Sequence, residues 1–153
     1  MSKEKGKDPA FLMYSKDWLE GTADMMPDEK GVYIDLLCHQ HQKDTLPADT
    51  RRLARIVGLP EDKFLPIWEH LKSKFDRING SRLVNHKLTT VVAERTTYSI
   101  IKKIAGEFAY LLRESGFSDD KKNKIKREFK MEQFSSLKQE EIKGVLQKWF
   151  SRW

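Results

Sequence analysis

Apolar residues return at the helical period along most of the chain and at a shorter period in one central stretch. Where they recur every three or four positions, an amphipathic helix is predicted. These stretches are residues 27–42, 51–58, 60–75, 88–115, 117–130 and 138–153. After Phe75 the period shortens towards about two, which indicates strands. The pattern therefore predicts an α+β fold class that is mainly α with a small β-hairpin.

The hairpin is predicted to turn at Asn79-Gly80. An Asn-Gly pair readily adopts the positive backbone angles of a tight turn, and about five residues on each side would form the strands. Upstream, the segment from Phe11 to Trp18 mixes aromatic and aliphatic residues over too few positions to show a period. We expect this segment to be a short strand or an extended arm.

Several helix ends are marked by residues that cap or stop helices. Asp49 or Thr50 can cap the helix that follows, and Gly58 can end it. The next helix opens at Pro60, and Pro66 is expected in its first turn, where a missing N–H costs little. The tight connection from Gly58 to Pro60 makes these two helices a helix-turn-helix candidate.

Length and charge narrow the class of protein. The chain has 153 residues, a length that fits one domain with an appended segment. Its formal net charge of +6 mildly favours a polyanionic partner. We expect a disordered tail over residues 1–10, a compact domain over 11–87 and a C-terminal helical extension over 88–153.

The single cysteine, Cys38, lies in a stretch that the pattern places on a buried helix face. A lone cysteine cannot form an intramolecular disulfide, which favours a reducing compartment. No apolar run approaches the roughly 18 residues that span a bilayer, and the charged N-terminus is not followed by the apolar core of a signal peptide. We expect a cytoplasmic protein with no membrane partner.

Basic residues gather before, within and after the predicted hairpin. DNA binding needs cations that meet phosphates and a helix or ribbon that enters a groove. The candidate DNA-binding residues are Arg51, Arg52, Arg55, Lys72, Lys74, Arg77, Arg82 and Lys87. Arg77 and Arg82 flank the turn, where they would meet the minor groove or the DNA backbone. The alternative is that these cations cover the solvated face of an ordinary domain.

The helix before the hairpin has a composition that suits a core better than base recognition. Phe64 and Trp68 belong to its apolar stripe, while Glu61, Asp62 and Glu69 would repel phosphate. A domain that serves as a scaffold for protein contacts therefore stays open beside DNA binding.

The last helix carries large aromatic residues on one face, namely Trp149, Phe150 and Trp153. Aromatic residues of this size are favoured at interface centres, so one interpretation is a partner or self-association surface. The other is packing against the long helix over residues 88–115. The basic run over residues 121–130 likewise fits a nucleic-acid tail or a solvated helix face.

No residue pattern indicates catalysis or a cofactor. The sequence has no Gly-rich phosphate loop and no Ser/His/Asp or Cys/His arrangement. His39 and His41 are two positions apart, so on a helix they point in different directions, and His70 and His86 stand alone. We expect no enzyme activity, no cofactor and no metal site.

A succession of short motifs runs from residue 11 to about residue 94. They are Asp17-Trp18-Leu19, Thr22, Gly31 with Tyr33, Leu36 and Leu37, Pro47, Leu53-Ala54-Arg55 with Gly58, and Lys74-Phe75. In this order they resemble the YdaU-like family of prophage proteins, a domain of unknown function also found at the N-terminus of phage replication initiators. One departure is the run from Cys38 to His41, where many members carry an aromatic residue.

The resemblance implies a winged-helix-like domain linked to phage or prophage DNA replication. We therefore expect a non-enzymatic DNA-associated replication protein, or replisome organiser, that contacts DNA through a basic wing. Its C-terminal helices would recruit replication proteins or pair with a second copy of the chain. The alternatives are a protein-interaction module built on the same scaffold and, less favoured, a transcriptional regulator.

Overall fold

The computed structural model describes residues 8–153, and its internal contacts group the chain into two compact units, residues 1–93 and 94–153. This division falls within a long helix, whereas the expected one falls after residue 87. The disordered tail expected over residues 1–10 lies mostly on residues 1–7, which are outside the described residues. No described helix has both the length and the apolar sequence needed to cross a membrane.

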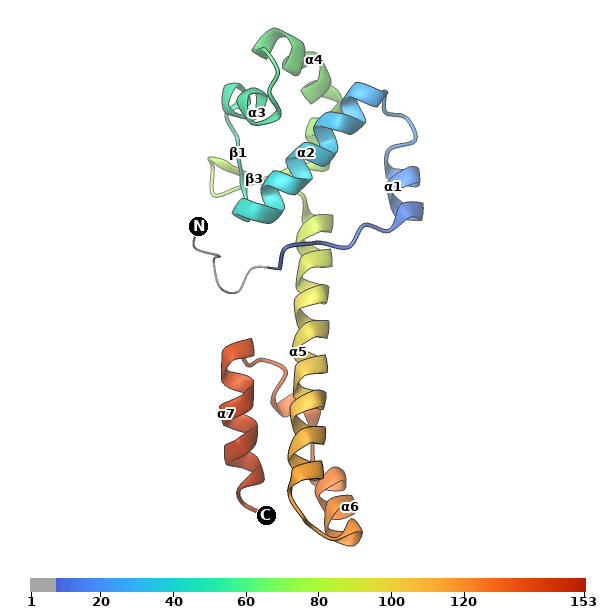
Figure 1. Cartoon of the computed structure of the whole chain (residues 1–153). Coiled ribbons are helices and arrows are strands. Elements are labelled where there is room, and N and C mark those ends of the chain that lie inside the picture. Colours follow the sequence, from blue (N-terminus) through green and yellow to red (C-terminus); the bar gives the residue numbers. More distant parts are fainter. Residues whose placement is uncertain (1–7) are drawn as a thin grey trace. The chain divides into compact units, whose positions relative to one another are not determined.

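The first unit contains short helices around a small sheet (Figure 1). Its elements are α1 (Ser15–Gly21), α2 (Pro27–Lys43), β1 (Leu46–Pro47), α3 (Thr50–Val57), α4 (Glu61–Leu71), the 3-10 turn η1 (Lys72–Lys74), β2 (Asp76–Ile78), β3 (Arg82–Val84) and the start of α5 (His86–Glu114). The predicted helices over residues 27–42, 51–58 and 88–115 are confirmed within a few residues at each end.

The core of the first unit lies between α2, α3, α4 and the sheet. Leu36, Leu53, Phe64 and Leu71 are fully buried there, and Leu46 of β1 joins them. Each such side chain contributes about 1.5–3 kcal/mol of hydrophobic stabilisation. The apolar stripes read at the helical period are therefore the surfaces that hold the three helices together.

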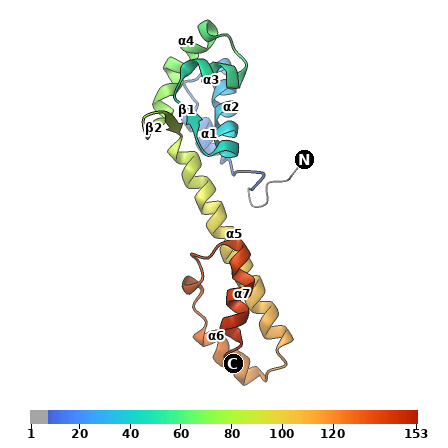
Figure 2. The ribbon, with the colours of Figure 1, turned by 90° about the vertical axis from the view of Figure 1, so that its left-hand side faces the viewer.

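The sheet has three antiparallel strands in the order β1-β3-β2. Asn79 and Gly80 have φ values of 40° and 80°, so the predicted turn chemistry is confirmed. The predicted strand length is wrong, since β2 and β3 have three residues each. The pairing of Leu46 in β1 with Leu83 in β3 was not predicted, because a two-residue strand is too short to show a period. Figure 2 shows β1 beside α3.

Three local predictions are wrong. The arm predicted over residues 11–18 is wrong for residues 15–18, which belong to the helix α1. The Thr22 hydroxyl donates to the Trp18 carbonyl at 2.7 Å at the end of this helix. Cys38 is exposed, since Leu37 faces the core and the next residue lies about 100° further round the helix. Pro66 lies in the interior of α4 rather than in its first turn.

Pro66 is tolerated because α4 is held by its buried face. A proline beyond the first turn costs about 3 kcal/mol. Burial of Phe64, Trp68 and Leu71 on α4 offsets this cost, at about 1.5–3 kcal/mol for each side chain. Tertiary packing therefore stabilises a helix that its own sequence weakens.

The second unit consists of the later part of α5 with α6 (Asp119–Glu128), η2 (Met131–Gln133) and α7 (Gln139–Phe150). Ile104 of α5, Ile142 and Leu146 of α7 and Phe134 form its buried core. Figure 1 shows α7 running alongside α5. Ser118 caps α6, since its hydroxyl accepts the Lys121 N–H at 3.3 Å.

Candidate functional site

A basic pocket lies where the β2–β3 turn meets the start of α3. It has a volume of about 460 Å³. Its lining residues come from three chain segments and are Pro47, Ala48, Asp49, Arg52, Arg77, Gly80, Ser81 and Arg82. The Ala48 N–H donates to the Ser81 carbonyl at 2.9 Å, which fixes the β1–α3 connection against the turn. The hairpin and α3 thus place three arginines around one pocket.

The arginines of the hairpin are held by its backbone and by Thr45. Arg82 donates from Nε to the Thr45 hydroxyl at 2.8 Å and from Nη2 to the Thr45 carbonyl at 3.1 Å. Arg77 donates from Nη1 to the Gly80 carbonyl at 2.8 Å. A guanidinium group has five N–H donors, so each arginine keeps donors beyond those that orient it.

Asp49 is the acidic residue among those that line the basic pocket. Its carboxylate caps α3 by accepting the Arg51 N–H at 2.9 Å and lies 3.4 Å from the Arg51 guanidinium. The backbone hydrogen bond from Arg51, followed by that residue's side chain, lowers the pKa of Asp49. Asp49 is therefore charged at neutral pH, and Arg51 faces this charge while Arg52, Arg77 and Arg82 give the pocket a positive excess.

The remaining DNA-binding candidates lie elsewhere. Arg55 is exposed on α3 and does not line the basic pocket. Lys72 forms an ion pair with Glu69 at 2.8 Å. Lys74 and Lys87 line a second pocket, so the structure divides the eight basic candidates among several surfaces.

This second, apolar pocket has a volume of about 290 Å³ and lies under the segment of residues 11–14 and α1. Its lining is mostly apolar and comprises Phe11, Leu12, Met13, Tyr14, Asp17, Trp18, Gly21, Thr22, Tyr33, Leu37, Lys74, Asp76, Asn85, His86, Lys87, Leu88 and Val91. In Figure 1, α1 lies on one side of α2 and the hairpin on the other. The two pockets are therefore bordered by different parts of the first unit.

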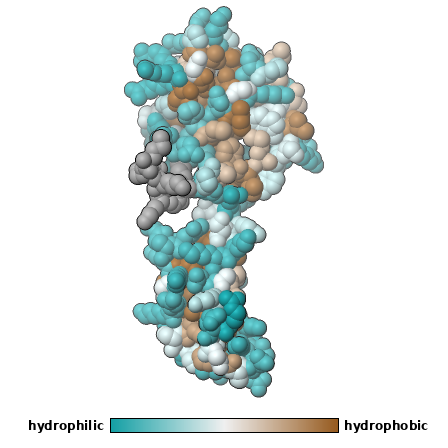
Figure 3. Space-filling model, in the orientation of Figure 1, coloured by the Kyte–Doolittle hydropathy of each residue, from teal (hydrophilic) through white to brown (hydrophobic). Residues whose placement is uncertain are grey.

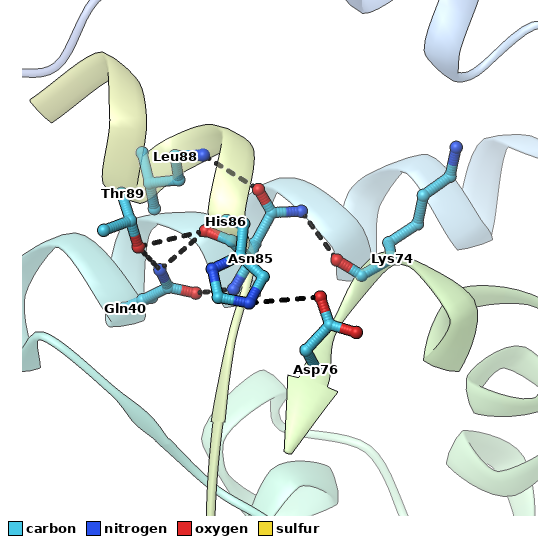
Figure 4. A network of polar contacts seen from close by, with 7 residues as sticks. All are labelled: Gln40, Lys74, Asp76, Asn85, His86, Leu88 and Thr89. Carbon is cyan, nitrogen blue, oxygen red and sulfur yellow. Dashed lines mark hydrogen bonds and ion pairs between the residues drawn. The ribbon is translucent and has the colours of Figure 1, made fainter. Parts of the chain in front are cut away.

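Asn85 joins segments that line the apolar pocket, and Figure 4 shows its polar contacts. Its side chain donates to the Lys74 carbonyl at 2.9 Å and to the Tyr33 hydroxyl at 3.1 Å, and it accepts the Leu88 N–H at 2.9 Å. Its backbone N–H donates to the Gln40 side chain at 2.7 Å. One buried residue thus caps α5 and ties it to α2 and to the start of β2.

Two histidines that stand alone in the sequence have carboxylate partners in the structure. His70 on α4 lies 2.6 Å from the buried carboxylate of Glu29 on α2, and His86 lies 3.3 Å from Asp76. The Glu29 carboxylate also accepts the Met26 N–H at 2.9 Å. These contacts link helices to each other and to the hairpin.

The C-terminal aromatic residues contact other residues of the second unit. Trp149 packs edge-on against Phe129 with ring centroids 5.5 Å apart, and Phe150 stacks on Phe117 at 5.8 Å. Trp153 lies 6.1 Å from Trp149, and its carbonyl accepts from Lys121 Nζ at 2.6 Å. The α7 helix therefore packs on its own chain, and self-association through these residues stays a prediction.

Two residues of these sites, Thr45 and Asn85, were not predicted from the sequence. Thr45 shows no signal in the sequence, since its role depends on β1 pairing with β3. Asn85 has one signal, because asparagine before a helix is a favoured cap, and it lies directly before α5. Its links to Gln40 and Tyr33 span more than 40 residues of chain and have no local pattern.

The architecture and the basic pocket define a small, mainly helical protein with a three-stranded antiparallel sheet and an arginine cluster at its hairpin. The model of the family described as "Protein of unknown function (DUF1376)" matches residues 11–93, which is more than half of the chain. The chain belongs to this family. No curated protein and no solved structure is similar enough to give a match.

Proposed function

We propose that this chain is a non-enzymatic DNA-binding protein that contacts the phosphates of duplex DNA through the basic pocket. The observation that carries this proposal is the convergence of Arg52, Arg77 and Arg82 on one pocket. Planar guanidinium groups with several donors match phosphate oxygens in pairs. Because Arg77 and Arg82 are oriented by the turn and by Thr45, less side-chain freedom is lost when they bind.

The proposed scaffold is a winged helix over residues 11–93. The chain order is α2, β1, α3, α4, β2 and β3, and β1 pairs with β3. This order and pairing support the proposed winged helix, in which the β2–β3 turn would be the wing. The wing would then carry Arg77 and Arg82 to the DNA, while α4 mainly supports it.

A role in phage or prophage DNA replication follows from the motifs that resemble the YdaU-like family. In that role the first unit would bind DNA, and the second unit would contact replication proteins. The description of the family names no activity. The proposed role in replication therefore has to be tested by biochemical measurement.

A second candidate function is protein contact through the same scaffold. The first turn of α4 carries Glu61 and Asp62, and Leu65 on this helix is exposed. An acidic and apolar helix face suits a protein partner and repels phosphate. This function would use α4 and leave the basic pocket without a ligand.

The DNA proposal is tested by measuring affinity for duplex, single-stranded and forked DNA over a range of salt concentrations. Each phosphate contact contributes about 0.9 to the salt slope on duplex DNA. The double substitution Arg52→Gln with Arg77→Gln should therefore lower the duplex slope by about two. Both side chains are exposed, so the fold should be kept.

Arg55→Gln is the matched control, because it removes the same charge from α3 outside the basic pocket. Its salt slope should stay close to that of the unaltered protein. An unchanged slope in the double variant, or an equal loss in the control, would contradict the pocket as the phosphate site. Binding of a protein partner that is abolished by Leu65→Glu alone would favour the second candidate.

A further inference from the structure

The segment before α2 leaves apolar side chains at the surface. Leu12 and Met13 are each 45% exposed and Tyr14 is 53% exposed, and α1 has no buried residue. All three side chains line the apolar pocket. In the view of Figure 3, more hydrophobic surface shows on the first unit than on the second. The segment therefore borders the pocket without filling it.

The inner wall of the apolar pocket offers little for a polar ligand group to bind. The Trp18 ring stacks on Tyr33 with centroids 5.5 Å apart, and Leu37, Leu88 and Val91 complete the lining there. The Tyr33 hydroxyl is bonded to Asn85 at 3.1 Å. The part of a ligand that enters the pocket should thus be apolar.

Charged residues around the apolar pocket leave one cation without a counterion. Lys87 pairs with Asp17 at 3.6 Å, and the His86 Nε2 atom lies 3.3 Å from the Asp76 carboxylate. Among residues 8–153, the Lys74 ammonium group has no carboxylate within ion-pair distance. Figure 4 shows the Lys74 side chain extending away from the Asn85 network while its carbonyl stays bonded. Lys74 is therefore available to an anion.

We propose that the apolar pocket binds a small amphiphilic carboxylate, with its apolar body against Trp18 and Leu37 and its carboxylate on Lys74. A cavity of about 290 Å³ is at the small end of ligand pockets and holds roughly ten non-hydrogen atoms. One apolar body with one negative charge matches both the lining and the single unpaired cation. Such a group occurs in a free organic acid or at the C-terminus of a peptide that ends in an apolar residue.

The test uses octanoate, octanamide and octylammonium as probes on the full chain, with binding followed by calorimetry and by the NMR signal of the Trp18 indole N–H. Octanoate should bind more tightly than octanamide, and octylammonium most weakly. Equal binding of octanoate and octylammonium, or no octanoate binding, would overturn the proposal. This comparison needs no variant, so a folding defect cannot obscure it.

Two variants test whether Lys74 is the cation that contacts the ligand carboxylate. Lys74→Met keeps the aliphatic stem and should weaken octanoate binding about tenfold, while octanamide binding stays nearly unchanged. Lys63→Met, an exposed position on α4 outside the pocket, should leave both affinities unchanged. Octanoate binding that survives Lys74→Met at full strength would refute the assigned contact.

Peptides distinguish the two sources of the carboxylate. A tripeptide that ends in leucine is compared with its C-terminal amide and with octanoate. Tighter binding of the free-acid peptide than of octanoate supports a protein C-terminus as the ligand, and the reverse order supports a free organic acid. Equal binding of the acid and amide peptides, together with equal binding of octanoate and octanamide, would remove the role of Lys74.

Discussion

The basic pocket and the apolar pocket share strand β2 yet differ in charge and lining. Arg77 lines the basic pocket and Asp76, its neighbour, lines the apolar pocket. Successive side chains of a strand point to opposite faces. A strand of three residues can therefore supply two surfaces of opposite character.

The two pockets also differ in how their basic side chains are held. In the basic pocket, Arg77 and Arg82 are bonded to the turn and to Thr45, so several positive charges are held in fixed positions. Around the apolar pocket, Lys87 is paired with a carboxylate and Lys74 is not. An array of fixed cations suits a polyanion, whereas one cation beside apolar walls suits a small anion. The following substitutions separate the two.

The largest effect is expected from Asn85→Ala, which should destabilise the first unit. The substitution removes the cap of α5 and leaves the Lys74 carbonyl and the Tyr33 hydroxyl without the Asn85 donor. Asn85 is 5% exposed, so water replaces these bonds poorly, and we expect a loss of about 3 kcal/mol in the free energy of unfolding. Hydrogen exchange of the backbone amides in α2 and at the start of α5 measures this loss of stability.

Asn123→Ala provides the control for Asn85→Ala. Asn123 is exposed on α6, so the change should stay within about 0.5 kcal/mol. If exchange in the first unit were the same for both variants, Asn85 would not be the residue that joins α5 to α2 and to the segment before β2.

An intermediate effect is expected from Gly80→Ala, which should disturb only the basic pocket. Gly80 has a φ of 80° and an added Cβ meets no atom within 4 Å, so the cost is backbone strain of about 1 kcal/mol. Duplex DNA binding should weaken, because the Gly80 carbonyl holds Arg77, while octanoate binding should not change.

Gly31→Ala is the matched control for Gly80→Ala. We expect it to change the free energy of unfolding in the opposite direction. Gly31 lies within α2 without a positive φ and with open space around an added Cβ. Alanine should stabilise this helix by up to about 1 kcal/mol. Thermal unfolding of both variants measures the two changes in stability. If Gly80→Ala stabilised the protein, the turn would not require a residue that adopts a positive φ.

The smallest effect concerns Tyr33 in the apolar pocket. Burial raises the pKa of the Tyr33 hydroxyl, and the hydrogen bond from Asn85 lowers it in part. The folded protein favours the neutral form, so this contribution to stability is complete below the ordinary tyrosine pKa of about 10 and is lost as pH rises above it. An absorbance titration of tyrosinate should show a late-titrating tyrosine that Tyr33→Phe removes.

Helices were predictable because their signals are local. Asp49 and Gly58 cap α3 as their residue types require, and Asn79-Gly80 forms the turn. The strand β1 was not predictable, because Leu46 and Pro47 become a strand only by pairing with β3. The exposed position of Cys38 and the interior position of Pro66 likewise depend on which helix face is buried and how strongly.

The candidate site was predictable in its residue types and not in its grouping. The basic residues near the hairpin were identified from the sequence, and Arg52, Arg77 and Arg82 do converge. No local sequence feature distinguishes Lys74 and Lys87 from these three arginines. Their place at the apolar pocket depends on strand alternation and on the position of α1. The apolar pocket was not anticipated, because it needs the segment of residues 11–14 to lie over α2 and α5.

The alternation of Asp76 and Arg77 also restricts how the hairpin can change in length. Inserting or deleting one residue directly before Asp76 would move every following side chain of β2 to the other face. The acidic residue would then enter the arginine cluster, and an arginine would enter the apolar pocket. Substitutions can alter either pocket one at a time, whereas single-residue insertions and deletions in β2 should be excluded among functional relatives.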